Sequence, residues 1–586
     1  MILSSKETQG FYLALLSFVF VFCSPEATAS VATVDASAAT AALDTLANPS
    51  SDQPGSNQPA QWYSVLPPII AISLAFLTRH LLFSLSSAVV AGAILFSIEN
   101  ATSNIIVASA SQSFHYFYTN VFNPWNLKVL AFVICILSMI SVVIVAGGLK
   151  GVVAHLLPYA KTPKSSQFIT AVTGLIVFID DYANTMIVGS SMRPITDQYH
   201  VSRSKLAFII DATSAPVAGL AVVSTWIGFE VGLFGEVSTS LNLNLDGYSM
   251  FFDAFAFRFY CILMLIFVFV QIYFGREFGP MLAAESNPLS SEKNDQSDQK
   301  HSHIRQAEVD PNSHISAKSA IIPFAILFTV LIGGLWVDGN GMAELNKHAS
   351  NIFSLSSWRR VIASTENSTT ILLLSAICGL VSSILIARFF ANARFNYIIN
   401  AIKIGTRTSL LPVLILLLAW SLKSTCDDLH TGDYIVGLLS PHLSPLWFPA
   451  ILFFIAAVTA FGTGTSWGTM SILIPISIPL AFALDGNTYG LVTIICLGAV
   501  LDGAIFGDHC SPISDTTIMS SIAAQCDHIE HVRTQVPYSL YIATIAIMAG
   551  YIPAAMATPA WVSYLLGITL LTIGLYLFGK KPNVRV

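Results

Sequence analysis

Residues 173–194 read TGLIVFIDDYANTMIVGSSMRP, and the two adjacent carboxylates in this stretch decide how the chain must fold. They lie in segment 167–192, which is mostly apolar and has the length of a membrane span. Asp180 and Asp181 fall near its middle. One Asp at the centre of a membrane helix costs about 2.5–3.5 kcal/mol, so two adjacent ones need partners or a function. Such residues mark a path for an ion, a proton or a substrate, and the pair therefore predicts a transporter.

The composition independently indicates a membrane protein. The chain has 586 residues, of which 54% are hydrophobic and only 10% are charged, and its mean hydropathy is +0.69. Soluble domains carry about 25% charged residues, so a single water-soluble domain is excluded. A net charge of −6 without a basic patch predicts no nucleic-acid partner. No cofactor is expected, because the sequence has no nucleotide-binding glycine loop and its eight cysteines do not pair at metal-ligand spacing.

The first 61 residues are expected to lie outside the transporter. Residues 11–23 form an apolar run that is followed by Ala27-Thr28-Ala29, the pattern of a signal-peptide cleavage site. Residues 1–29 are therefore predicted to be a cleaved signal peptide, with a short uncleaved anchor helix as the alternative. Residues 30–61 have the composition of a flexible linker.

The rest of the chain predicts an all-α polytopic protein of the inner membrane. Residues 62–274 and 319–579 are expected to form two transporter halves, joined by a polar cytoplasmic loop at 275–318 and followed by a cytoplasmic tail at 580–586. The apolar segments lie at 63–79, 81–98, 128–149, 167–192, 206–234, 251–274, 319–337, 369–388, 408–424, 445–484, 488–521, 537–556 and 559–578.

The basic residues predict that segment 167–192 enters and leaves the membrane on the same side. Lysines and arginines in short loops mark the cytoplasmic side, and they occur both before the segment, at 150–164, and after it, at 193–205. Both loops are cytoplasmic only if the segment is a re-entrant hairpin. Segment 445–484 is predicted to be a second hairpin that enters from the outside. Lys347, Arg359 and Arg360 would then lie outside, against the rule.

The two predicted hairpins also share sequence. Phe178 to Ile195 follows the pattern F-x6-TM…P-I, and Phe461 to Ile476 follows F-x7-TM…P-I. Each is followed by a segment with an acid and a proline, Asp211-ATSA-Pro216 and Asp508-HCS-Pro512. Related sequences that enter from opposite sides predict an inverted-topology repeat with re-entrant hairpins and broken helices.

Neutral oxygens near the predicted breaks are suited to bind a cation. Broken backbone is tolerated at membrane depth where it lines a cavity, and its free polar groups can then bind ions. Hard cations prefer oxygen ligands. An alternative is that these small residues only allow close helix packing. The candidate ligands of this kind are Asn184, Thr185, Thr213, Thr463, Thr465 and Ser466.

The second acidic cluster lies in GAVLDGAIFGDHCSPISDTTIMSS, residues 498–521. Carboxylates that are buried close together cannot all stay ionised, so one of them can hold a proton or a cation in competition. His509 is a candidate proton relay, although a lone histidine is more often structural. The candidate carboxylates are Asp502, Asp508 and Asp515, together with Asp211 in the first half.

Four stretches resemble the NhaC-type Na+/H+ antiporter family: FIDDYANTMIVGSSMRPITD, VSRSKLAFIIDATSAPVAGLAVVSTWIG, FGTGTSWGTM with IPI, and GDHCSPISDTT. They lie within residues 167–535. The resemblance implies an inverted repeat with scaffold and transport domains, elevator movement being one option, and Na+ export in exchange for H+. The positions that match the motifs are Asp180, Asp181, Asn184, Thr185, Asp211, Asp502, Asp508, Ser511 and Asp515.

The leading hypothesis is therefore a secondary transporter, not an enzyme, that exchanges Na+ (or Li+) for H+. The transported ions and the lipid bilayer are its expected partners, and a homodimer is left open. The alternative is a Na+- or H+-coupled exchanger of organic acids or amino acids, of the malate/lactate type, on the same scaffold. That alternative predicts a buried cation or a hairpin N-terminus facing a substrate carboxylate. A receptor or a structural membrane protein would not need mirrored acidic motifs.

Overall fold

The computed structural model describes residues 61–583 except 79, 101–103, 244, 289–308, 344–360, 362–364, 366 and 440–442. Within these ranges the chain forms helices and no β-strand, apart from one isolated bridge between Glu277 and Lys580. The predicted signal peptide, nearly all of the predicted linker and the basic residues at 347, 359 and 360 lie outside the described residues.

The first half contains twelve described α-helices before the polar loop, and α16 follows within that loop. They are α4 (Leu66–Thr78), α5 (Leu81–Glu99), α6 (Ile105–Phe122), α7 (Pro124–Val145), α8 (Gly148–Leu156), α9 (Pro163–Ile176), α10 (Asp181–Gln198), α11 (Arg203–Ala212), α12 (Ala215–Ala218), α13 (Thr225–Ser240), α14 (Gly247–Phe255), α15 (Phe259–Phe274) and α16 (Gly279–Ser286).

The second half begins at the end of the polar loop. Its described helices are α17 (Lys318–Asp338), α20 (Ser368–Phe389), α21 (Phe395–Asp428), α22 (Thr431–Leu439), α23 (Phe448–Thr463), α24 (Ser466–Leu484), α25 (Leu491–Cys510), α26 (Asp515–Ala524), α27 (His528–Ile545), a π-helical stretch (Ala546–Tyr551), α28 (Ile552–Ala555) and α29 (Ala560–Phe578).

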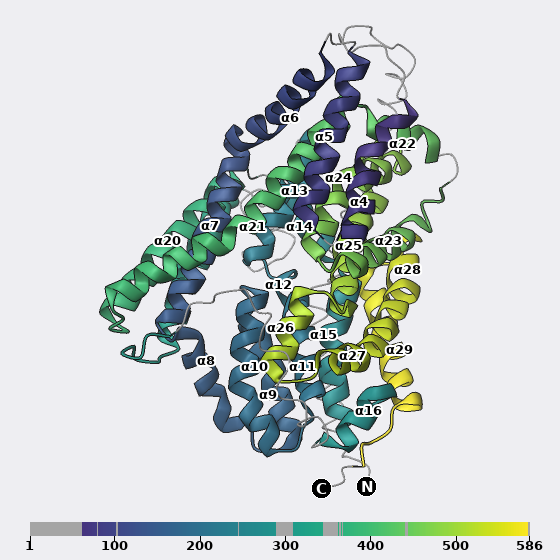
Figure 1. Ribbon diagram of the computed structural model, residues 1–586. Coiled ribbons are helices and arrows are strands. Elements are labelled where there is room, and N and C mark those ends of the chain that lie inside the picture. Colours follow the sequence, from purple (N-terminus) through teal and green to yellow (C-terminus); the bar gives the residue numbers. More distant parts are fainter. Residues whose placement is uncertain are drawn as a thin grey trace.

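Among the described residues, nine helices are long and apolar enough to cross a membrane. A tenth span is formed if α14 and α15, which meet at an angle of 49°, are counted as one broken helix. The prediction of an all-α polytopic membrane protein with broken helices is therefore confirmed. Figure 1 shows a long molecule in which α8 to α11 lie at the lower end and α5, α6 and α22 lie at the upper end.

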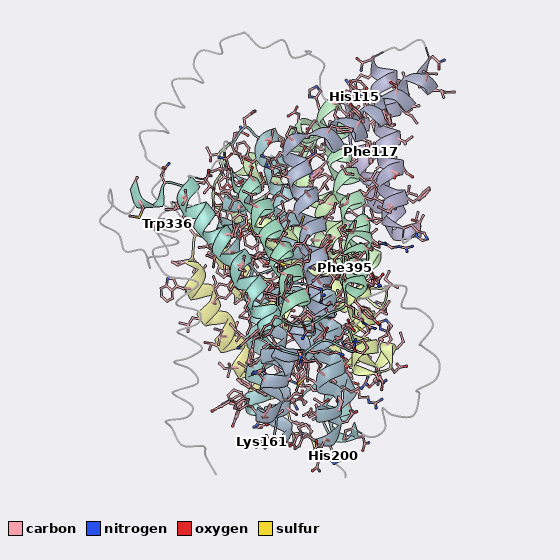
Figure 2. All side chains as sticks on the ribbon, turned by 90° about the vertical axis from the view of Figure 1, so that its left-hand side faces the viewer. His115, Phe117, Lys161, His200, Trp336 and Phe395 are labelled. Atoms are coloured by element: carbon pink, nitrogen blue, oxygen red, sulfur yellow. The ribbon has the colours of Figure 1, made fainter. Side chains whose placement is uncertain are left out.

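Helices α9 and α10 form the first hairpin, with Asp180 and Asp181 at its tip. Lys161, just before α9, and His200, just after α10, lie at the same end of the molecule (Figure 2). The side chain of Asn184 donates a hydrogen bond of 2.7 Å to the backbone oxygen of Gly174. Ten residues would span about 15 Å along one straight helix, so this contact requires the chain to fold back.

Helices α23 and α24 meet at a second break. Gly464 ends α23 in the left-handed conformation, with φ of 70°, which favours glycine. Thr465 then begins α24, and its side chain accepts a hydrogen bond of 3.3 Å from the backbone N–H of Gly468. The helix is interrupted here because the left-handed glycine ends α23 and the threonine that follows it caps the N-terminus of α24.

The packing against α25 shows that α23 and α24 run in opposite directions. A side-chain carbon on Gly503 would lie 2.4 Å from the backbone oxygen of Phe453, and one on Gly507 would lie 2.1 Å from that of Ala457. The contacts advance in the same direction along both helices, so α23 and α25 are parallel. A short turn at 485–490 joins α24 to α25, so α24 returns antiparallel to α23. In Figure 1, α24 lies in the upper half, whereas α9 and α10 lie in the lower half.

Each hairpin is followed by a broken helix. Helices α11 and α12 are interrupted at residues 213–214, and α25 and α26 are interrupted at residues 511–514. A hairpin and a broken helix thus occur twice, and the two hairpins point in opposite directions, which is the arrangement expected of an inverted repeat.

Three segments differ from the sequence prediction. Segment 206–234 is divided among α11, α12 and α13, because the Ser/Thr- and Pro-containing stretch near 213–216 interrupts the backbone ladder. Residues 105–122, absent from the predicted spans, form the amphipathic helix α6. Helix α21 has 34 residues, about twice the length of the apolar segment 408–424 from which it was predicted.

A buried ion cluster ties the two halves together. The Arg258 side chain donates a hydrogen bond of 2.8 Å to Asp502 and lies 3.6 Å from the Glu230 carboxylate. Asp502 also accepts hydrogen bonds from the Tyr260 backbone N–H (2.7 Å) and the Tyr551 hydroxyl (2.8 Å). The three charged side chains are buried, so each charge is stabilised by the opposite charges beside it instead of by water.

The hairpin is tested by labelling single cysteines at positions 161 and 200 in a protein without its native cysteines. Because both ends of a hairpin leave the membrane on the same side, a membrane-impermeant maleimide added to one side should label both sites. A cysteine at position 115, at the opposite end in Figure 2, should react from the other side. Labelling of positions 161 and 200 from opposite sides would show that the segment crosses the membrane.

Arg258→Leu should strongly destabilise the protein. The change leaves two buried acids without their cation, and breaking a buried ion pair in this way costs about 3–5 kcal/mol. The thermal unfolding midpoint in detergent should fall clearly. Arg533→Leu is the matched control, because the Arg533 side chain is 69% exposed and its one ion pair among the described residues is with Glu530, one turn earlier. An unchanged midpoint in Arg258→Leu would refute the role of the cluster.

Candidate ion-binding site

The N-termini of α10 and α13 meet in the first half, and those of α24 and α26 meet in the second. The Thr225 backbone N–H, at the start of α13, donates a hydrogen bond of 2.9 Å to the backbone oxygen of Ile179 in the first hairpin tip. In the second half, a side-chain carbon on Gly464 would lie 2.7 Å from the backbone oxygen of Ile513. Both breaks therefore bring two helix starts within contact distance.

Aromatic rings join the two pairs of helix starts. The ring of Trp226, in the first turn of α13, lies 5.8 Å from the ring of Trp467, in the first turn of α24. The N-terminus of a helix carries a partial positive charge and free N–H groups. Four such ends in one region can balance negative charge, which accounts for the acids that the sequence places there.

Asp180 and Asp181 make different contacts at the first tip. Asp180 caps α10, because its carboxylate accepts a hydrogen bond of 2.8 Å from the backbone N–H of Ala183. The Asp181 carboxylate accepts one of 3.0 Å from Tyr182. The side chains are only 7% and 4% exposed, and those of Thr225 and Trp226 lie beside them. The hydrogen bond that caps α10 therefore gives Asp180 a structural role in the tip that Asp181 does not share.

Asp508 is the centre of the second half of the site. One oxygen of its carboxylate, Oδ2, accepts hydrogen bonds from the hydroxyls of Ser466 (3.4 Å) and Thr516 (3.3 Å). The other, Oδ1, has no hydrogen-bond partner among the described residues, although the side chain is only 3% exposed. A buried acceptor without a partner is rare, and a bound cation or proton would satisfy it. Thr516 was not among the candidates from the sequence.

The remaining candidates with neutral oxygens line the breaks. Most of their hydroxyl hydrogens are donated to backbone oxygens, which leaves oxygen lone pairs free to contact a cation. These bonds are Thr185 to Asp181 (2.8 Å), Thr213 to Ile209 (2.8 Å), Thr463 to Thr459 (2.8 Å) and Ser511 to Phe461 (2.8 Å). Asn184 donates to the backbone oxygen of Gly174 across the first hairpin and to that of Thr213 at the break between α11 and α12, and Thr465 caps α24.

Asp515 and Asp502 lie apart from this group in different ways. Asp515 is the first residue of α26 and is exposed, so it lies where water reaches the second break. Asp502 is buried in the cluster with Arg258, and both of its oxygens are occupied there. Its contacts favour a structural role over cation binding.

Glu230 and Arg258 were not predicted as members of this cluster, since no sequence motif places either residue beside Asp502.

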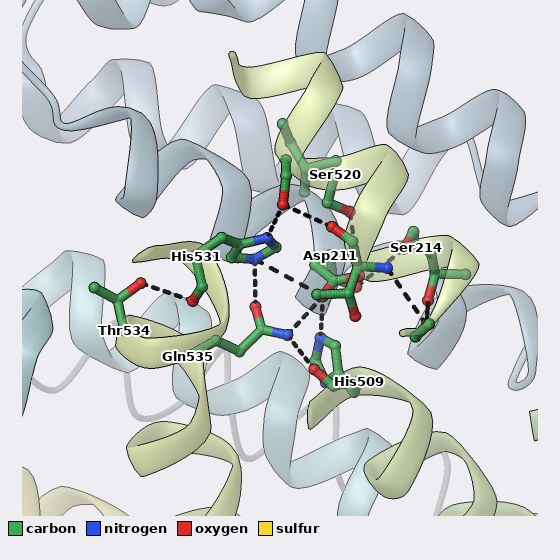
Figure 3. Close-up of polar contacts among 12 residues, drawn as sticks. Asp211, Ser214, His509, Ser520, His531, Thr534 and Gln535 are labelled. Atoms are coloured by element: carbon green, nitrogen blue, oxygen red, sulfur yellow. Dashed lines mark hydrogen bonds and ion pairs between the residues drawn. The ribbon is translucent and has the colours of Figure 1, made fainter. Parts of the chain in front are cut away.

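Asp211 lies at the centre of a separate polar network (Figure 3). Its carboxylate accepts hydrogen bonds from Ser520 (3.2 Å) and Gln535 (2.5 Å). His509 and His531 lie 3.5 Å and 3.9 Å from the same carboxylate. Gln535 and His531 were not predicted as site residues, although the spacing of 528, 531 and 535 in α27 places three polar residues on one helix face.

Within the described ranges, no group of three or more His, Cys, Asp or Glu side chains is arranged to hold a metal ion. The oxygen donors of the candidate site are a few carboxylates, several hydroxyls and the backbone oxygens at the helix breaks, a set suited to a weakly held hard cation.

Sequence comparison places these features in a family. The Na+/H+ antiporter family matches residues 217–553. An uncharacterized protein of Haemophilus influenzae is 30% identical over 501 residues, which cover 84% of this chain and 90% of that protein. The malate-2H+/Na+-lactate antiporter of Bacillus subtilis is 32% identical over 149 residues, 24% of this chain and 29% of that protein.

Structural comparison agrees on the architecture. The crystal structure of the YdaH transporter of Alcanivorax borkumensis has a TM-score of 0.50 to this chain at 13% identity, and the match covers 76% of this chain and 90% of that one. A similarity at this level of identity shows the fold alone. With the family match over more than half of its length, the chain belongs to the Na+/H+ antiporter family, whose members are membrane antiporters and not enzymes.

Proposed function

We propose that this antiporter exchanges Na+ for H+ and that both ions compete for buried carboxylates between the two hairpin tips. The observation that carries the proposal is the Asp508 carboxylate. One of its oxygens has no partner among the described residues, and the other accepts hydrogen bonds from two hydroxyls. Li+ is the alternative cation, because it requires the same hard oxygen ligands.

Competition for one carboxylate is sufficient for exchange. An ionised carboxylate holds Na+, and a proton that binds to it removes the negative charge that retains the cation. The site therefore holds either ion but not both, and each full cycle returns the protein to its starting state. The ion gradients supply the free energy, so no nucleotide and no covalent step are needed.

The contacts support different roles for the acids. Asp508, with the hydroxyls of Ser466 and Thr516, is the proposed cation ligand of the second half. Asp181 is its counterpart in the first half, because Asp180 is committed to capping α10. Asp211 lies among histidines and an amide and is the proposed proton carrier.

The opposite directions of the hairpins support alternating access. Movement of one hairpin tip relative to the other would open the shared site to one side of the membrane at a time. The positively charged loops predict that the first hairpin opens to the cytoplasm of a cell with this protein in its inner membrane.

An exchanger of organic acids is the second candidate. Two observations favour it: four helix N-termini meet at the site, and they attract carboxylates as well as balancing Asp side chains. A relative of known substrate is named a malate-2H+/Na+-lactate antiporter. The described buried cations are already paired, however, since Arg258 contacts Asp502 and Glu230, and Lys205 contacts Glu277.

Asp508→Asn should abolish cation-dependent proton movement. The substitution keeps the shape but removes the charge, and losing a buried charged contact costs about 2–5 kcal/mol, which corresponds to a loss of about 30-fold or more. The measurement is the dissipation of an imposed proton gradient in everted vesicles after Na+, Li+, K+, malate or lactate is added. Asp181→Asn should have the same effect.

Asp433→Asn is the control, because the Asp433 side chain is 79% exposed and its one ion pair among the described residues is with His430. It should retain full exchange at equal expression. If only malate or lactate dissipates the proton gradient in vesicles with the native protein, exchange of organic acids replaces Na+/H+ exchange as the proposed function. If Asp508→Asn exchanges Na+ normally, the assignment of Asp508 to the site is wrong.

A further inference from the structure

The end of the last helix is held against the end of α15. The Nη1 atom of Arg276, just after α15, donates hydrogen bonds of 2.7 Å to the backbone oxygens of Tyr576 and Gly579. The backbones of Glu277 and Lys580 exchange two further hydrogen bonds, of 2.9 Å and 2.8 Å. In Figure 1, α9, α16 and α29 lie in the lower half of the molecule. These contacts therefore bring the basic residues after α29 next to those after α15.

The start of the first hairpin lies at the same place. Lys164, in the first turn of α9, donates a hydrogen bond of 2.9 Å to the backbone oxygen of Tyr273. A side-chain carbon on Gly275 would lie 3.1 Å from Cε of this lysine. Partial burial and the positive charge of Lys581 lower the pKa of the Lys164 ammonium group. The hairpin and the last helix thus place like charges within electrostatic range of each other.

The basic cluster is the group Lys164, Arg276, Lys580 and Lys581. None of its members forms an ion pair with a described residue, and the acids of this region have other partners. The Glu277 carboxylate points inward and lies 3.1 Å from Nζ of the buried Lys205. The Glu285 carboxylate accepts a hydrogen bond of 2.8 Å from the backbone N–H of Ser202. The positive charge of the cluster is therefore not neutralised by the described part of the chain.

The cluster also keeps hydrogen-bond donors for a ligand. Lys164 uses one of its ammonium hydrogens on the Tyr273 oxygen. The hydrogen bonds that Arg276 makes to described residues all start from Nη1, which leaves Nε and Nη2 to donate elsewhere. The guanidinium lies 4.4 Å from the ring centroid of Tyr576, and this stacking fixes its plane. Positive charge with free N–H groups is the arrangement that binds phosphate oxygens.

The surface beside the cluster is suited to lipid chains. Tyr576, Leu577 and Phe578 form the last turn of α29 and are 62%, 69% and 71% exposed. Only 39% of the apolar window of this helix is buried inside the protein, so the rest of its surface faces the bilayer. A phospholipid can place its acyl chains on this surface while its headgroup meets the lysines that follow. A soluble phosphate would use the charges alone.

We propose that the basic cluster binds the phosphate headgroup of an anionic phospholipid in the inner leaflet. Basic residues at the cytoplasmic membrane surface attract anionic lipids, and the basic loops predict that this end of the protein is cytoplasmic. The phosphate oxygens accept hydrogen bonds from Lys164 and Arg276, and the acyl chains lie along α29. One bound headgroup thus links the start of the first hairpin to the last helix. This lipid site is independent of which ion the protein exchanges.

The site is tested by native mass spectrometry of the full-length protein in detergent. Dioleoyl-phosphatidylglycerol and dioleoyl-phosphatidylcholine are added separately, because they share their acyl chains and differ in net charge. The first phosphatidylglycerol should bind about tenfold or more tightly than phosphatidylcholine. Lys164→Gln and Lys581→Gln should each weaken this binding about fivefold, whereas Lys164→Arg keeps the charge and should bind as the native protein does. Inorganic phosphate at the same concentration should not displace the lipid.

Lys403→Gln is the matched control. It removes one exposed positive charge on the same predicted side of the membrane, but from α21, and should leave the affinity for phosphatidylglycerol within about twofold. Thermal unfolding midpoints without added lipid check that each variant is folded. Lys581 is exposed and its side chain makes no hydrogen bond to a described residue, so Lys581→Gln decides the outcome if Lys164→Gln proves unstable.

Four results would overturn the lipid site. Equal affinities for phosphatidylglycerol and phosphatidylcholine would show that the charge is not recognised. Displacement by inorganic phosphate would show that the cluster binds a soluble anion instead. Native affinity in Lys581→Gln would remove the cluster from the binding site, and an equal loss in Lys403→Gln would show that only the overall surface charge matters. None of these results bears on the proposed Na+/H+ exchange, which is measured by transport.

Discussion

The structure depends on one electrostatic balance: carboxylates buried at membrane depth are stabilised by the free N–H groups of interrupted helices. A continuous helix satisfies its own backbone and offers nothing to a buried charge. Breaks at Asp180, Ser224, Thr465 and Ser514 expose four helix N-termini. Each of these residues also caps the helix that follows it, three with a hydroxyl oxygen and Asp180 with its carboxylate. The interruptions are therefore required by the acids, and the acids remain available to bind ions.

The same breaks explain why the fold is repeated in opposite directions. A hairpin can bring its tip to membrane depth from one side only, so a site reached from both sides needs two of them. The Arg258 cluster and the Trp226–Trp467 contact join the halves around these tips. Asp211, the proposed proton carrier, lies beside the broken helices of the second half, where Ser520 and Gln535 contact it. The polar network of Asp211 thus lies next to the proposed cation site, since His509 in this network directly follows Asp508.

The sequence predicted the features that leave a local signal. Asp180 and Asp181 stand out in an apolar segment, and the shared F…TM…P-I pattern with the basic loops indicated both hairpins. Features that depend on tertiary contacts were not predictable in this way. Arg258, Glu230 and Asp502 come together from three helices, so Asp502 looked like a cation ligand until its arginine was visible. Thr516 and Gln535 carry no charge, and only their neighbours Asp508 and Asp211 reveal their importance.

The central claim is that Na+ and H+ compete for the same buried carboxylates. It is tested most directly by titrating the purified protein with Na+ in a calorimeter, at one pH, in two buffers that differ in their enthalpy of ionisation. Competition predicts that Na+ binding releases protons, so the measured heat must differ between the buffers, and the apparent affinity for Na+ must fall as the pH is lowered. Equal heats in both buffers, with an affinity for Na+ that does not change with pH, would contradict the account.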